Sequence, residues 1–130
     1  MENVKIKLAV LYLALEVIWL AHIGWSLFEP GMIGQVTSGT TELTPETFTV
    51  FAVVLLVGLA MAFLSLTLKD STNRWANIIV GIVFIVLDLM IMISRLQEEK
   101  VFAYSTLLEA SGVVVPAMIV WYAWKWPKQK

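Results

Sequence analysis

The chain has 130 residues, of which 59% are hydrophobic and only 15% are charged, and its formal net charge is −1. Soluble domains carry about a quarter charged residues, so this composition indicates an integral membrane protein, and the length indicates one domain over residues 1–130. The chain has no cysteine, which excludes disulfide scaffolds, thiolate metal sites and dithiol redox chemistry. The near-neutral charge also lacks the basic patch that nucleic-acid binding requires, so we expect no nucleic-acid partner.

Four stretches are long and apolar enough to cross a membrane, which takes about 20 residues of helix. They cover residues 8–28, 48–68, 75–94 and 102–124. In lipid, the backbone groups of such a stretch must be satisfied within the segment, so each stretch is predicted to be an α-helix. The chain is therefore predicted to be an all-α membrane protein built as a four-transmembrane-helix bundle.

The connection after the first span has its own pattern. Glu29-Pro30-Gly31 is predicted to end the first span, and Met32–Ser38 to form a short helix at the membrane surface that stops at Gly39. Pro45 is suited to the first position of the second span, because its missing N–H has no helical partner there.

Lysine and arginine are distributed unevenly between the two predicted sides of the membrane. One side would hold Lys5, Lys7, Lys69, Arg74, Lys125, Lys128 and Lys130, and the other side only Arg95 and Lys100. Positively charged residues gather on the cytoplasmic side of membrane proteins. Both termini are therefore predicted to be cytoplasmic, in a multi-pass protein of the cell membrane.

Four ionisable residues lie inside the predicted spans: Glu16, His22, Asp88 and Glu109. Such residues are rare in membranes, usually face the interior of the bundle and often serve function. At about 1.5 Å per residue, His22, Asp88 and Glu109 are expected at one level in the outer half of the membrane, with Glu16 nearer the middle. We therefore predict a polar cavity within the membrane that opens outward and binds a ligand.

Aromatic residues extend this predicted site. Tyr12 and Trp19 lie on the same side of the first span as Glu16, and Phe84 lies one helical turn from Asp88. Aromatic rings beside carboxylates suit a cationic or lipidic small molecule through cation–π contact. The predicted ligand-binding residues are Glu16, Trp19, His22, Asp88, Glu109, Tyr12 and Phe84.

The sequence does not favour an enzyme. No pairing of a nucleophile with a base is visible, so no catalytic residue is assigned. The first span lacks the ligand spacing of a metal site, and we expect neither a metal nor another cofactor.

The same polar residues also have a structural interpretation. His22 would be a packed histidine bonded to a neighbour, and Asp88 and Glu109 would bond each other or Arg95 to hold helices together. Under this alternative the protein is a non-catalytic accessory subunit of a larger membrane complex. Four short spans enclose little volume, which favours a homodimer under either interpretation.

Several segments resemble a known group of proteins. EPGMIGQ, ELTPETF, NRWANIIVGI and WYAWKWP resemble a family of small prokaryotic four-span membrane proteins of unknown function, similar to the DoxX-like group. The resemblance covers most of the chain. It implies a four-span fold in a prokaryotic plasma membrane and association with a larger membrane complex, and it assigns no catalytic residue.

A shorter segment, LALEVIWL around Glu16, is similar to the first span of the small multidrug resistance transporters, which use a glutamate embedded in the membrane. This similarity implies proton-coupled export through Glu16. The chain departs from the transporter pattern in its longer connection after the first span and in its additional charges at Asp88 and Glu109.

Overall fold

The chain is described by a computed structural model over residues 2–39, 45–97 and 103–126. Regular structure in these ranges is entirely helical, and the helices are α1 (Glu2–Ser26), α2 (Met32–Thr37), α3 (Pro45–Thr67), α4 (Asp70–Gln97) and α5 (Ala103–Trp124). Segments long and apolar enough to cross a membrane are Asn3–Trp25, Pro45–Thr67, Asp70–Gln97 and Ala103–Trp124. The predicted all-α class, with four helices of membrane-spanning length, is confirmed.

The helix boundaries differ from the prediction mainly at polar ends. α1 begins at Glu2 rather than Leu8 and ends at Ser26 rather than Phe28, and α4 spans Asp70–Gln97 rather than 75–94. The apolar run measures the part that lipid would surround, whereas helical hydrogen bonds continue into the polar turns at each end. Phe102, where the last span was predicted to begin, lies outside the described residues.

The short connection after α1 follows the expected pattern. α2 ends at Thr37, and Gly39 follows with a φ of 75°, a conformation that glycine adopts without a steric penalty. Gly31, just before α2, also has a positive φ of 82°. Pro45 opens α3, as expected for a proline at the first helical position.

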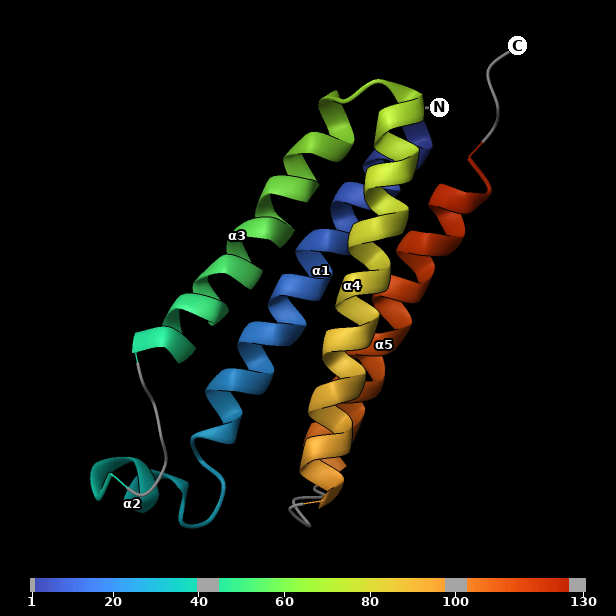
Figure 1. Cartoon of the computed structure of the whole chain (residues 1–130). Coiled ribbons are helices and arrows are strands. Elements are labelled where there is room, and N and C mark those ends of the chain that lie inside the picture. The colour runs from blue at the N-terminus through green and yellow to red at the C-terminus, as the bar shows by residue number, and fades with distance from the viewer. Residues whose placement is uncertain (1, 40–44, 98–102, 127–130) are drawn as a thin grey trace.

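The four long helices form an antiparallel bundle (Figure 1). The start of α1, the end of α5 and the connection between α3 and α4 lie at one end, called the terminal end here, and α2 lies at the opposite end, called the α2 end. α1 packs against both α3 and α5, α4 packs against α5, and α3 makes little contact with α4. Figure 1 shows that α3 and α4 lie close together at the terminal end and diverge toward the α2 end.

The bundle buries polar residues and exposes apolar ones. Its interior contains Glu16, Ser65, Asn73, Asn77, Asp88, Ser105 and Glu109, beside the apolar side chains of Leu8, Tyr12, Leu15, Phe84 and Ile119. Large apolar side chains such as Val17, Leu56 and Ile79 are exposed on the outer helix faces. Soluble proteins rarely expose contiguous apolar surface of this kind, so the distribution fits a protein surrounded by lipid.

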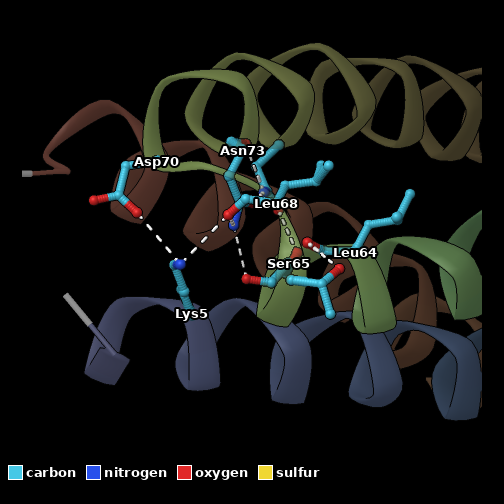
Figure 2. A network of polar contacts seen from close by, with 8 residues as sticks. Lys5, Leu64, Ser65, Leu68, Asp70 and Asn73 are labelled. Carbon is cyan, nitrogen blue, oxygen red and sulfur yellow. Dashed lines mark hydrogen bonds and ion pairs between the residues drawn. The ribbon is translucent and has the colours of Figure 1, made fainter.

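A polar network joins three helices at the terminal end (Figure 2). Asn73 donates a hydrogen bond from its side chain to the Ser65 carbonyl at 2.7 Å, and Lys5 Nζ lies 3.3 Å from both the Leu68 carbonyl and Asp70 Oδ1. The Ser65 hydroxyl donates to Asn77 Oδ1 at 3.2 Å. These bonds hold α1, α3 and α4 together at the end from which α3 and α4 diverge.

Candidate functional site

A cluster of charged side chains joins the helices near the α2 end. This Arg95 cluster consists of His22 on α1, Glu29 after α1, Arg95 on α4, and Tyr104 and Glu109 on α5. Arg95 Nη2 donates to Glu29 Oε1 at 2.5 Å, and Arg95 Nε lies 2.8 Å from Glu109 Oε1 without the alignment of a hydrogen bond. His22 Nε2 lies 3.2 Å from the same Glu109 oxygen, and the Tyr104 hydroxyl donates to Glu29.

Arg95 pairs with both carboxylates of the Arg95 cluster. The side chains of Arg95 and Glu29 are only 11% and 4% exposed, and a charge buried to that extent is costly unless it is paired and hydrogen-bonded. Here one guanidinium serves two carboxylates, and Tyr104 and His22 contribute further polar contacts. The arrangement therefore ties the connection after α1 to α4 and α5.

Glu29 and Tyr104 are members of this cluster that were not among the predicted site residues. Glu29 was interpreted only as part of the segment that ends the first span. A signal was present, because a carboxylate next to Pro30-Gly31 at a membrane surface poor in cations calls for a specific partner. The sequence could not show that Arg95 was that partner, since the two residues lie 66 positions apart.

The other two carboxyl groups, Glu16 and Asp88, are each seated against a glycine of a neighbouring helix. A Cβ added at Gly58 would lie 2.5 Å from Cδ of Glu16, and one added at Gly112 would lie 2.5 Å from Oδ1 of Asp88. Both glycines therefore make room for a carboxyl group. Glu16 Oε1 and Asp88 Oδ2 are buried and have no hydrogen-bond partner within the described part of the chain.

Two aromatic residues on α1 share this property. The Tyr12 hydroxyl and the Trp19 ring nitrogen are also buried without a hydrogen-bond partner among the described residues. Both rings pack edge-on against Phe84, each with a centroid separation of 6.4 Å. Tyr12, Glu16 and Trp19 are spaced by four and three residues, so α1 presents one side with three unsatisfied polar groups.

A cavity of about 460 Å³ lies between α1 and α3. Its lining consists of Glu16, Trp19, Leu20, Ile23, Leu27, Phe48, Phe51, Ala52, Val54 and Leu55. Glu16 is the single ionisable residue of this lining, and on α1 it is the lining residue farthest from the α2 end. Leu20, Leu27 and Phe48 are exposed on the outside of the bundle, so the cavity opens sideways on the surface that faces lipid.

A smaller cavity of about 260 Å³ lies between α3 and α4, where these helices diverge. It shares Trp19, Phe51 and Val54 with the larger cavity. Trp19 therefore stands between the two cavities. The larger one has the size of a typical small-molecule site.

The structure divides the predicted site residues into separate groups. Glu16 and Trp19 line the larger cavity, and Tyr12 and Phe84 pack beside them in the core. His22 and Glu109 meet in the Arg95 cluster. Asp88 lies against Gly112. Because Gly112 follows Glu109 by three residues on α5, Asp88 lies about one helical turn deeper in the bundle than Glu109. In the described residues, no three His, Asp or Glu side chains are arranged to hold a metal ion.

Comparison of the chain with protein-family models, with curated proteins and with solved structures found no match. The resemblances to the DoxX-like group and to the small multidrug resistance transporters therefore stay predictions. The function has to be argued from the geometry of the bundle.

Proposed function

We propose that the protein binds a small amphiphilic molecule, lipidic in character, in the cavity between α1 and α3. One observation carries this proposal. Glu16 is 4% exposed, and its carboxyl group has a buried oxygen without a partner among the described residues, at the inner end of a cavity that is otherwise apolar. An unpartnered carboxyl group in a membrane is expensive, and such groups commonly serve function.

The chemistry of the lining indicates the kind of ligand. A hydroxyl or ammonium group could donate a hydrogen bond to the Glu16 carboxyl group, and the Trp19 ring nitrogen offers a donor nearby. The rings of Trp19, Phe48 and Phe51 suit an apolar body or a cationic head. Because the cavity opens between exposed leucines, the ligand would enter sideways from the lipid.

The orientation of the protein belongs to the same proposal. In the described residues the terminal end carries Lys5, Lys7, Lys69, Arg74 and Lys125. Toward the α2 end, Arg95 is the cation among the described residues, and Glu29 and Glu109 hold it inside the bundle. This asymmetry favours a cytoplasmic terminal end, with the cavity in the outer half of the bilayer. The resemblance to small prokaryotic membrane proteins implies that this bilayer is the plasma membrane of a prokaryote.

Native mass spectrometry of the full chain purified in mild detergent tests the proposal. A copurifying molecule should appear as added mass on the wild type and should be lost from Glu16→Gln, which keeps the volume of the side chain. Glu46→Gln is the matched control, because Glu46 lies exposed in the first turn of α3 and should keep the adduct.

A second variant tests the cavity without altering Glu16. Ala52 lines the cavity, so Ala52→Phe should fill it and also remove the adduct. An adduct of unchanged mass and occupancy on both Glu16→Gln and Ala52→Phe would contradict the proposal.

Transport is an extension of the same site. A carboxyl group without a fixed partner can hold either a proton or a cationic ligand, which is what proton-coupled export requires. Proteoliposomes with a pH gradient should then accumulate a cationic dye, and Glu16→Gln should abolish the accumulation. Binding without dye accumulation would restrict the protein to a binding role.

An accessory subunit is the second candidate, and the Arg95 cluster favours it. Arg95 pairs with both carboxylates of this cluster, so its charged side chains join helices. This candidate predicts that no small-molecule adduct copurifies with the wild type and that a second membrane protein does.

A further inference from the structure

The last turn of α5 is surrounded by cations at the terminal end. Lys7 Nζ lies 5.2 Å from the ring centroid of Tyr122, and Arg74 Cζ lies 5.6 Å from that of Trp124. Lys125 Nζ lies 4.1 Å from the centroid of Trp121. The three cations come from α1, from α4 and from the residue after α5, and each is positioned over an aromatic ring of α5.

These contacts fall on one side of α5. The Lys125 amide still donates to the Trp121 carbonyl at 3.0 Å, so the helical repeat continues through this residue. At 3.6 residues per turn, Trp124, Trp121, Lys125 and Tyr122 cover an arc of roughly 160°. Trp121 and Trp124 are 56% and 60% exposed, so the arc faces away from the bundle. Lys7 and Arg74 border it from the two helices that pack against α5.

Within the described residues, part of the positive charge of this surface has no carboxylate partner. Arg74 donates hydrogen bonds to the carbonyls of Ala123 at 3.2 Å and Trp124 at 3.3 Å, so it satisfies the negative end of the α5 dipole. Lys5 is paired with Asp70. Within the described residues, the ammonium groups of Lys7 and Lys125 form no ion pair with a carboxylate.

We propose that this surface binds the headgroup of an anionic phospholipid. The phosphate would accept hydrogen bonds from Lys7 and Lys125, and the acyl chains would run along the exposed, apolar face of α5 beside Trp121. Tryptophan and tyrosine occupy the headgroup level of membrane proteins, and basic residues there attract anionic lipids. A lipid fits better than a free phosphate ion, because the exposed rings and the apolar helix give its chains a surface.

This site is independent of the cavity between α1 and α3. The two lie toward opposite ends of the bundle, and the Glu16 carboxyl group is unsuited to an anionic head. The proposal for one site can therefore be contradicted while the proposal for the other stands.

Competitive binding in native mass spectrometry tests this inference. The full chain in detergent is mixed with equal amounts of phosphatidylglycerol and phosphatidylcholine, and the ratio of the two bound lipids is measured. The wild type should prefer phosphatidylglycerol. Each of Lys7→Gln and Lys125→Gln should lower the preference about fivefold, the equivalent of about 1 kcal/mol for one basic residue near an anionic surface.

Lys69→Gln is the matched control, because Lys69 is exposed at the same end, in the connection between α3 and α4. It should leave the preference unchanged, and the double variant Lys7→Arg/Lys125→Arg should retain it. An equal loss in Lys69→Gln would overturn the inference, since it would indicate a diffuse charge effect. Displacement of the lipid by the same concentration of inorganic phosphate would overturn the assignment to a lipid. Loss of the preference in Glu16→Gln would overturn the independence of the two sites.

Discussion

Single residues decide where the unpartnered carboxyl groups of this bundle lie. Glu16 and Asp88 occupy space that a side chain at Gly58 or Gly112 would take. In both cases the glycine serves close approach between helices, as small residues do at membrane helix interfaces. The position of the Glu16 carboxyl group at the inner end of the cavity therefore depends on a residue of α3 as much as on α1.

Gly58→Ala should leave the protein about 1–3 kcal/mol less stable than Gly24→Ala, because its new methyl group must displace the packed Glu16 side chain. Gly24→Ala is the control, since nothing lies within 4 Å of a Cβ at Gly24 in α1. Gly24 lies in the last turn of α1, and replacing a glycine inside a helix should stabilise by at most about 0.5–1 kcal/mol. Thermal unfolding in detergent measures both.

The double variant Gly58→Ala/Glu16→Ala should recover most of the lost stability, because it removes the side chain that the methyl group meets. Equal melting temperatures for Gly58→Ala and Gly24→Ala would show that the Glu16 carboxyl group is not seated on Gly58.

At the scale of elements, Arg95 connects parts of the chain that helix packing alone would leave separate. Glu29 belongs to the connection after α1, Arg95 to α4, and Glu109 to α5. Packing between α4 and α5 and between α5 and α1 places these helices side by side. The ion pairs of Arg95 then fix the connection that leads from α1 to α2.

Arg95→Gln should destabilise the protein by about 3–5 kcal/mol, because removing one member of a buried ion pair leaves the remaining charges uncompensated. Combining it with Glu29→Gln should cost less than the sum of the two single changes, with a coupling of about 0.5–3 kcal/mol for residues in direct contact. Reversible unfolding in mixed micelles gives the free energy of unfolding of the wild type, of each single variant and of the double variant. Strict additivity would show that Arg95 and Glu29 do not act as a pair.

At the scale of the whole molecule, the divergence of α3 from α4 shapes the cavities. The polar network of Ser65, Asn73 and Asn77 holds α3 and α4 together at the terminal end. Toward the α2 end, α3 leans away (Figure 1), and the two cavities that share Trp19 lie beside it. The larger one opens on the lipid-facing surface, which is why the proposed ligand is an amphiphile.

The orientation can be tested cleanly because the chain has no cysteine. In intact cells, a membrane-impermeant maleimide should label Ser38→Cys, which lies exposed just after α2. It should label Thr72→Cys, exposed near the start of α4, only after the cells are permeabilised. This difference follows from the excess of positive charge at the terminal end. The opposite labelling pattern would place the termini outside the cell.

The sequence by itself determined the class of the protein and the approximate extent of its four long helices. Lipid leaves an apolar segment no alternative to helical hydrogen bonds, so composition and length were sufficient. The spacing of Phe84 and Asp88 by one helical turn also placed them on one face of α4, which is buried in the structure.

Only the tertiary structure decided which polar groups meet. Depth along a helix follows from residue number, so a common level for His22 and Glu109 could be expected from the sequence. The partner of a side chain depends on the rotation of each helix and on which helices are neighbours, and one sequence records neither. For this reason Arg95 and Glu29 complete the cluster of His22 and Glu109, whereas Glu16 meets Gly58 and Asp88 meets Gly112.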